Sequence, residues 1–399
     1  MEPWIAPSVV GGFRYALVMS FDSTPRDSAS LLPPSGRTLT AHVDLGQLVR
    51  NHTSLRRAVR GLGLLAVVKA DAYGHGAGPV ARALEASGID GFCVATLDEA
   101  LELRAAGLRG PILVFEGEAP EALPVAAANA IDLTVVSAEH LAALAPGLKQ
   151  HDVGLHLKLD TGMGRSGILL DELGGCLDQI RALQDRVRGV MSQFSASEEP
   201  EALSVRRQRQ RFQGALAQLR EAGIVAPMVH HGNSAACLRG FSEGDTHARC
   251  GIALYGLSEV DEAQQAGLRP ILELSAEVTR SVLIPAGTPV GYGSSFLAPR
   301  ALRLVTLNCG YADGFSRALA NRARVGYLGD TFPIVGNLSM DMLTVALPED
   351  VVVRTGERMT LLSRNPLNPN SVQSTARLLG TIPYEVTCAL NRRVLRHHF

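Results

Sequence analysis

The chain has 399 residues, of which 46% are hydrophobic and 19% are charged. This composition is typical of a globular protein with a large buried interior, and the length predicts two domains with room for a short extra segment. The 38 basic and 39 acidic residues leave a net charge of −1. Because no bulk field attracts nucleic acid or an anionic membrane, small neutral or zwitterionic ligands are the favoured partners.

Cysteine usage and hydropathy indicate the compartment. The six cysteines show neither metal-ligand spacing nor a C-x-x-C pair, which predicts reduced thiols and no metal site. No apolar run approaches the roughly 18 residues that a membrane helix needs. The apolar stretch Tyr15–Met19 is too short for a secretion signal. We therefore expect a cytoplasmic protein that does not span a membrane.

In chain order, residues 1–37 come first and lack sustained periodicity, so they are predicted to be a flexible leader. From residue 38, short apolar runs alternate with longer amphipathic stretches, a pattern of strands followed by helices. Leu97–Gly107 is a clear helical stretch that ends at a glycine. The eight candidate strands are Leu64–Val68, Gly91–Ala95, Ile112–Phe115, Asp132–Val136, Leu155–Leu159, Gly189–Phe194, Met228–His231 and Ala248–Gly251.

Eight strand-then-helix units in one block predict a (β/α)8 barrel over residues 38–270, with a doubly wound open sheet as the alternative. After about Pro270 the pattern changes to closely spaced short strands separated by Gly and Pro, which predicts a separate β-rich domain over residues 271–399. Its candidate strands are Leu272–Val278, Arg303–Asn308, Thr331–Val335 and Met342–Ala346.

Unusual residues fall at the carboxyl ends of the candidate strands, where the active site of a (β/α)8 barrel lies. The first strand ends in Lys69, four residues before Tyr73, and a neutral lysine amine attacks carbonyl carbons. Ser234 follows the seventh strand at a predicted helix start, and Gly251 and Ile252 follow the eighth with backbone N–H groups suited to a phosphate. Each feature alone also fits a surface lysine, a helix cap or a turn. Together they predict pyridoxal phosphate, which carries an aldehyde and a phosphate.

Arg249 precedes this phosphate cradle and is expected near the cofactor ring. An arginine cannot accept the proton of the ring nitrogen or share it as a carboxylate does. The ring would then be a poor electron sink, which suits brief removal of a proton from an α-carbon.

With these features the chain resembles the alanine racemase family over roughly residues 38–396. The matching segments are Ala66–Gly76, Lys158–Gly167, Asn233–Ala236, Arg249–Gly256, Gly291–Gly293, Gly310–Gly314, Met340–Asp341 and Tyr384–Val386. The resemblance implies a homodimeric isomerase that uses pyridoxal phosphate to interconvert L- and D-alanine. It assigns Lys69 as the cofactor lysine and the base on one face of the substrate, and Tyr292 of the second subunit as the base on the other. Stereoinversion needs two such bases, since one removes the α-proton and the other returns a proton from behind.

The resemblance implies further roles. Lys158 matches a lysine that is carbamylated in many members, where the new carboxylate orients Arg165. His75 and His231 are interpreted as structural. Residues implied to bind the cofactor are Tyr73, Ser234, Arg249, Gly251, Ile252 and Tyr384, and those implied in the substrate region are Arg165, Tyr311 and Met340.

The chain departs from the family pattern within Met191–Phe194, where Gln193 replaces a histidine that links the catalytic tyrosine to the ring arginine. A glutamine bridges two partners but carries no charge and relays no proton. Gly232, where alanine is usual, and Asn337–Ser339 also differ. These changes are compatible with slow alanine turnover, or with a racemase that acts on serine or a wider set of small amino acids.

Two other functions fit the same scaffold less well. A decarboxylase of this fold places an acidic residue at the ring nitrogen and a cysteine near the second face, whereas this chain offers Arg249 and Tyr292. A non-catalytic barrel that only binds pyridoxal phosphate lacks the C-terminal β domain predicted here.

Overall fold

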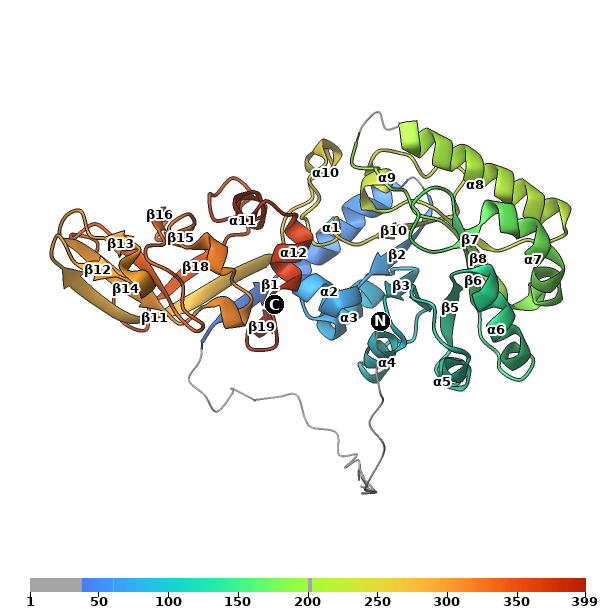
Figure 1. The fold of residues 1–399 in the computed structure, drawn as a ribbon, viewed down its shortest axis with the longest axis horizontal. Helices are drawn as coiled ribbons and strands as arrows, with labels where there is room; N and C mark the ends of the chain where they lie inside the picture. The colour runs from blue at the N-terminus through green and yellow to red at the C-terminus, as the bar shows by residue number, and fades with distance from the viewer. Residues whose placement is uncertain (1–37, 60, 200–202) are drawn as a thin grey trace, which may run out of the picture. The chain divides into compact units, whose positions relative to one another are not determined.

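The computed structural model describes residues 38–59, 61–199 and 203–399. The expected leader at residues 1–37 lies outside the described residues. Two large sheets organise the described part of the chain. One is a ring of parallel strands, and the other is a mostly antiparallel sheet formed chiefly by the C-terminal third (Figure 1).

Among the described residues, eight parallel strands follow one another around the first sheet in the order β10-β2-β3-β4-β5-β6-β8-β9. The ring closes between β9 and β10, because the Thr246 N–H donates to the Val229 carbonyl at 2.8 Å and the Arg249 N–H to the Gly232 carbonyl at 3.1 Å. The predicted (β/α)8 barrel and its eight strands are therefore confirmed. The strands are β2 (Gly63–Val67), β3 (Gly91–Val94), β4 (Ile112–Val114), β5 (Ile131–Val135), β6 (Leu155–Asp160), β8 (Val187–Met191), β9 (Met228–His230) and β10 (His247–Cys250).

Helices follow the barrel strands and cover the outside of the ring (Figure 1). The strands are buried on both faces, as in β6, where all six residues are buried. Side-chain caps start several helices: Thr96 Oγ1 accepts from the Glu99 N–H, and Ser137 Oγ from the His140 N–H. The elements are α1 (Leu45–Ala58), α2 (Lys69–Gly74), α3 (Ala77–Ala86), α4 (Leu97–Ala105), η1 (Pro120–Ala122), α5 (Leu123–Ala128), α6 (Ala138–Leu148), β7 (Ile168–Leu169), α7 (Leu170–Ala182), η2 (Gln184–Arg186), α8 (Leu203–Glu221), α9 (Ser234–Leu238) and α10 (Asp261–Gln265).

The C-terminal part forms the predicted β domain, and its longest strand, β11, pairs with β14, β18 and β1. The strand β1 (Thr40–Val43) lies at the other end of the described chain, yet it pairs antiparallel with β11 and parallel with β19. The first strand after residue 38 thus belongs to the second sheet, although the sequence placed it with the barrel, because pairing over more than 200 residues leaves no local signal. The elements are β11 (Leu272–Ile284), β12 (Pro289–Val290), η3 (Tyr292–Ser294), β13 (Phe296–Leu297), β14 (Leu302–Leu307), η4 (Tyr311–Asp313), η5 (Arg317–Leu319), β15 (Arg324–Tyr327), β16 (Asp330–Pro333), β17 (Leu343–Leu347), β18 (Arg358–Leu362), α11 (Val372–Leu379), α12 (Pro383–Cys388) and β19 (Leu395–His398).

The helix α12 joins the β domain to the barrel mouth. A Cβ built on Gly74, at the end of α2, would lie 2.1 Å from the carbonyl oxygen of Thr387, so the two helices touch through backbone. This contact brings Tyr384 of α12 within 5.7 Å of Tyr73, measured between ring centroids. No helix among the described residues is both long and apolar enough to span a membrane.

Candidate active site

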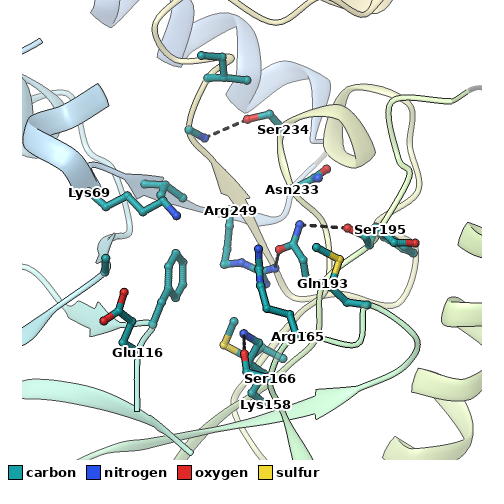
Figure 2. A pocket seen from close by; sticks show the side chains of 18 of the residues that line it. Lys69, Glu116, Lys158, Arg165, Ser166, Gln193, Ser195, Asn233, Ser234 and Arg249 are labelled. Carbon is teal, nitrogen blue, oxygen red and sulfur yellow. Dashed lines mark hydrogen bonds between the residues drawn. The ribbon is translucent and has the colours of Figure 1, made fainter. Parts of the chain in front are cut away.

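A cavity of about 730 Å³ lies at the carboxyl ends of the barrel strands (Figure 2). Its lining includes Gln193 and most of the residues that the sequence singled out. Three others, Tyr292, Tyr311 and Met340, belong to the β domain and are not part of this lining in the described chain. The predicted residues in the lining are Lys69, Tyr73, Lys158, Arg165, Ser234, Arg249, Gly251, Ile252 and Tyr384.

The turn α2, which follows the first barrel strand, is left-handed. The four residues Ala70–Tyr73 have φ between 51° and 55°, a conformation that costs L-residues roughly 1–2 kcal/mol each. Hydrogen bonds from both sides hold it: the Ala70 N–H donates to Glu99 Oε1 at 2.7 Å, and Asp71 Oδ1 accepts from the Ala77 N–H at 2.8 Å. The strained turn brings the lysine and the tyrosine of this segment into the same cavity.

The segments after β9 and β10 form a small polar cradle. Asn233 caps α9 by accepting from the Ala236 N–H at 3.0 Å, which fixes Ser234 at the first turn. The Gly251 N–H donates to Ser234 Oγ at 3.0 Å. A Cβ on Gly251 would lie 2.5 Å from Tyr73 Oη, so glycine is the residue that leaves the tyrosine its place.

Three tyrosine rings pack beside this cradle, with Tyr73 5.1 Å from Tyr255 and 5.7 Å from Tyr384 between centroids. Tyr255 donates to the Val67 carbonyl at 2.9 Å. The hydroxyls of Tyr73 and Tyr384 have no protein partner among the described residues. Burial raises the pKa of both Tyr73 and Tyr384, so each stays neutral and can donate a hydrogen bond into the cavity.

Arg249 is 3% exposed and lies at the base of the cavity. Its Nη1 donates to His230 Nδ1 at 2.8 Å, and its Nη2 donates to Gln193 Oε1 at 3.0 Å and to the carbonyls of Ser192 and His231 at 2.7 and 3.2 Å. The third nitrogen, Nε, has no acceptor in the described chain. Burial lowers the pKa of Arg249, although an arginine remains charged.

Lys158 and Arg165 line another part of the same cavity (Figure 2). Lys158 Nζ donates to Ser166 Oγ at 2.5 Å. Burial, aided by the neighbouring Arg165 and Arg249 cations, lowers the pKa of Lys158 to about 8. The loop that carries Arg165 is held by Asp160, whose Oδ1 accepts from backbone N–H groups at residues 162 to 164.

The β-domain residues that the sequence placed in the site lie on a different surface. Tyr292 is 72% exposed, Met340 53% and Tyr311 42%. Tyr292 borders a separate hollow of about 450 Å³ together with Asn337 and Ser339. Asn337 Nδ2 donates to the Tyr292 carbonyl at 2.8 Å, which fixes the tyrosine backbone while its ring extends toward solvent.

Sequence reasoning missed several buried polar residues around the cavity. Gln208 of α8 accepts from the Ser195 N–H at 3.0 Å and donates to the Gln193 carbonyl at 2.8 Å, so it holds the segment that carries Gln193. His156 lies two residues before Lys158 on β6, and this two-residue spacing was a signal that both face the barrel interior.

Two histidines that the sequence assigned to structural roles are both buried in aromatic contacts. His75 stacks on Tyr255 with a centroid separation of 4.5 Å, and His231 stacks on Phe194 at 3.7 Å. Burial lowers the pKa of His75 to about 4 and that of His231 to about 3, so both are neutral near pH 7.

Barrel, cavity and β domain together define a two-domain barrel enzyme with a lysine in its cavity, and comparison with known proteins gives the family. A family model described as alanine racemase, N-terminal domain matches residues 43–259, and the alanine racemase C-terminal domain matches residues 271–398. An alanine racemase of Syntrophobacter fumaroxidans is 36% identical over 355 residues, covering 88% of this chain and 94% of the relative. The chain belongs to the alanine racemase family and is an isomerase.

Solved structures agree in fold. The alanine racemase of Streptomyces lavendulae has a TM-score of 0.85 at 31% identity, covering 92% of this chain and 98% of the relative. The Bacillus anthracis enzyme, solved with bound L-Ala-P, has a TM-score of 0.84 at 33% identity, with coverage of 92% and 96%. The Bartonella henselae enzyme, solved with covalently bound pyridoxal phosphate, has a TM-score of 0.80 at 29% identity, with coverage of 91% and 99%.

Proposed function

We propose that this protein interconverts L- and D-alanine with pyridoxal phosphate, and that Lys69 and the partner subunit's Tyr292 act on opposite faces of the substrate. The observation that carries the proposal is the cavity that joins Lys69, Arg249 and the Ser234–Gly251 cradle in one chamber. Family membership supports the same reaction.

The residues of the cavity fit the cofactor. Arg249 Nε and the hydroxyls of Tyr73 and Tyr384 are polar groups in the lining without a protein partner in the described chain, and they suit a ring nitrogen and a phosphate. The cradle at Gly251 is kept open by the lack of a Cβ. Bound pyridoxal phosphate would draw electrons away from the α-carbon of an amino acid and so acidify its α-hydrogen.

Two groups are proposed to move the proton. Lys69 Nζ exchanges a proton with the α-carbon from the barrel side, and Tyr292 Oη of the partner subunit exchanges one from the opposite side. Removal by one group and return by the other inverts the configuration. Tyr292 is largely exposed and outside the cavity of its own chain, which supports its use by a second copy.

Other residues are proposed to bind the substrate. Arg165 would pair with the substrate carboxylate, and Tyr311 and Met340 of the partner subunit would narrow the entrance. We propose that Lys158 is carbamylated and then orients Arg165, because its pKa of about 8 leaves a substantial fraction of neutral amine near that pH. Only a neutral amine adds to carbon dioxide.

Complementing variants test the shared active site. Lys69→Ala and Tyr292→Phe proteins, each with strongly reduced activity, are mixed, unfolded gently to exchange subunits, and assayed for D-alanine by chiral chromatography. A mixed dimer has one site with both bases, so activity should return to about a quarter of the wild-type value. No recovery, despite subunit exchange shown by differently tagged chains, would contradict a site that combines residues from two subunits.

A substrate panel tests the specificity. We propose alanine as the preferred substrate, with serine and other small amino acids as the competing assignment. Purified protein with pyridoxal phosphate is incubated with each L-amino acid, and both enantiomers are measured. Failure to form D-alanine above a protein-free control would reject the proposed reaction, and release of carbon dioxide would indicate a decarboxylase.

A further inference from the structure

A line of four polar side chains runs from the cavity through the barrel interior toward the other end of the strands. Arg249 Nη1 lies 2.8 Å from His230 Nδ1, and His230 Nε2 lies 2.8 Å from His156 Nδ1. His156 Nε2 in turn lies 3.5 Å from Asp132 Oδ2. The two imidazoles are fully enclosed, at 0% and 1% exposure, whereas the Asp132 side chain is 26% exposed at the start of β5.

The chemistry of Arg249 fixes the direction of the two hydrogen bonds in this line. A guanidinium only donates, so His230 Nδ1 accepts and the proton of that ring sits on Nε2. His230 Nε2 then donates to His156 Nδ1, which places the proton of His156 on Nε2, facing the Asp132 carboxylate. Both rings are therefore neutral and hold the same tautomer, between a cation at one end and an anion at the other.

Two glycines leave room for this line. A Cβ on Gly189 of β8 would lie 2.3 Å from His156 Nδ1, and a Cβ on Gly154 would lie 2.1 Å from Asp132 Oδ1. Neither glycine has a positive φ, so the backbone does not require glycine at these places. A larger residue at position 189 or 154 would therefore occupy the space that the side chains of His156 and Asp132 need.

The line matters because Arg249 is buried without an ion-pair partner among the described residues. Its acceptors are carbonyl oxygens, Gln193 Oε1 and His230 Nδ1, all neutral groups. Among the described residues, the carboxylate of Asp245 forms no ion pair with Arg249; it accepts hydrogen bonds from the backbone N–H groups of His231 and Gly232 instead. A buried charge is costly unless fixed dipoles stabilise it, and two aligned imidazoles that end at a carboxylate supply such dipoles.

We propose that His230, His156 and Asp132 are positioning residues that hold the Arg249 guanidinium in place, with Nε directed at the cofactor ring. The role of Arg249 rests on the proposed function, but the order of hydrogen bonds does not. The two claims can fail separately.

The first test reads the tautomers directly. The full-length protein, with and without pyridoxal phosphate, is labelled with 15N-histidine and studied by NMR, with His230→Asn and His156→Asn variants for assignment. Both rings should be neutral with the proton on Nε2. A proton on Nδ1 of either ring, or a charged ring, would overturn the proposed line whether or not the protein is a racemase.

The second test breaks the line and follows cofactor binding. His156→Leu leaves His230 Nε2 without an acceptor and should raise the cofactor dissociation constant about tenfold. His156→Asn offers an oxygen near the former Nδ1 position and should restore much of the affinity. Asp132→Asn, which removes only the charge, should have a smaller effect, on the order of threefold, and should shift the visible absorption of the bound cofactor.

Asp152→Asn is the matched control, because Asp152 is an exposed carboxylate at the same end of the barrel that pairs with Arg186. It should change neither the affinity nor the absorption. Equal effects of Asp132→Asn and Asp152→Asn would show that loss of any negative charge at this end of the barrel has the same result. That outcome would overturn the proposal. If His156→Leu does not fold, the comparison of the two aspartate variants still decides the question.

Discussion

The barrel mouth and the exposed surface of the β domain differ in how far their polar side chains are buried and held by other residues. At the barrel mouth, Arg249 is 3% exposed and Tyr73 7%, and hydrogen bonds to His230, Gln193 and the Ser192 carbonyl hold the Arg249 guanidinium. On the β domain, Tyr292 is 72% exposed and is not among the described residues that line the cavity. One surface is an enclosed polar cavity, and the other presents a tyrosine side chain to solvent.

This difference separates two tasks of the proposed reaction. Cofactor binding and proton transfer on one face need only groups that one chain holds in place. Proton transfer on the second face needs a group that this chain displays outward. A single chain is thus expected to bind pyridoxal phosphate, whereas inversion of configuration is expected to need a second copy.

The largest effect is expected for Lys69→Ala, which removes the proposed barrel-side base and the amine proposed to hold the cofactor. Racemase activity should fall at least about ten-thousandfold, and borohydride should no longer attach the cofactor covalently. Mass spectrometry of the reduced protein measures the attachment. Lys149→Ala is the control, since this chain has three lysines and Lys149 is exposed and outside the cavity.

Tyr292→Phe should separate the two surfaces. Activity should fall roughly a hundredfold to ten-thousandfold, while the cofactor dissociation constant and covalent attachment stay unchanged. Tyr327→Phe, which removes a β-domain hydroxyl bonded to Glu357, is the control and should keep full activity. Loss of cofactor binding in Tyr292→Phe would place this tyrosine inside the binding site and contradict the division.

Gly251→Ala should damage the barrel mouth alone. The added Cβ would lie 2.5 Å from Tyr73 Oη, so the tyrosine or the cradle must shift. Overpacking of this kind costs roughly 1–3 kcal/mol, which predicts about a tenfold or greater loss of cofactor affinity in a fluorescence titration. Gly175→Ala is the control, because no atom of the described residues lies within 4 Å of a Cβ there.

Removal of carbon dioxide should lower activity about tenfold if Lys158 is carbamylated. Carbamate formation joins the neutral amine to carbon dioxide and releases a proton. With a pKa of about 8, the neutral fraction of Lys158 falls as the pH drops below 8, so the loss should be larger at pH 7 than at pH 9. Bicarbonate should restore activity in the wild type but not in Lys158→Ala, and an activity independent of bicarbonate would exclude the carbamate.

Gln193→His should have the smallest effect, a severalfold change in kcat/KM. Gln193 accepts from Arg249 Nη2 at 3.0 Å, and a histidine at this position would add a titratable neighbour. The pH profile of kcat/KM should gain an inflection near the ordinary histidine pKa of about 6.5. An unchanged profile would show that this residue does not influence the proton-transfer groups.

The sequence correctly predicted that the strand ends carrying Lys69, Ser234 and Gly251 meet at one cavity. Apolar runs that end in Lys69, Ser234 and Gly251 have a local signature, and the parallel barrel fold brings such ends to one mouth. The left-handed turn at Ala70–Tyr73 has no such signature, because its backbone is held by Glu99 from another helix. The pairing of β1 with β11 and β19 was also hidden, since partners so far apart along the chain share no periodicity.

The sequence by itself determined which residue types end each strand, the alternation of strands and helices, and the family. These are properties of neighbouring residues, which hydrophobic periodicity and short motifs record directly. Only the tertiary structure decided that Arg249 would be held by His230, His156 and Asp132, and that Tyr292 would face away from its own cavity. Those arrangements depend on which strands become neighbours, because burial and hydrogen-bond direction arise when separate segments meet.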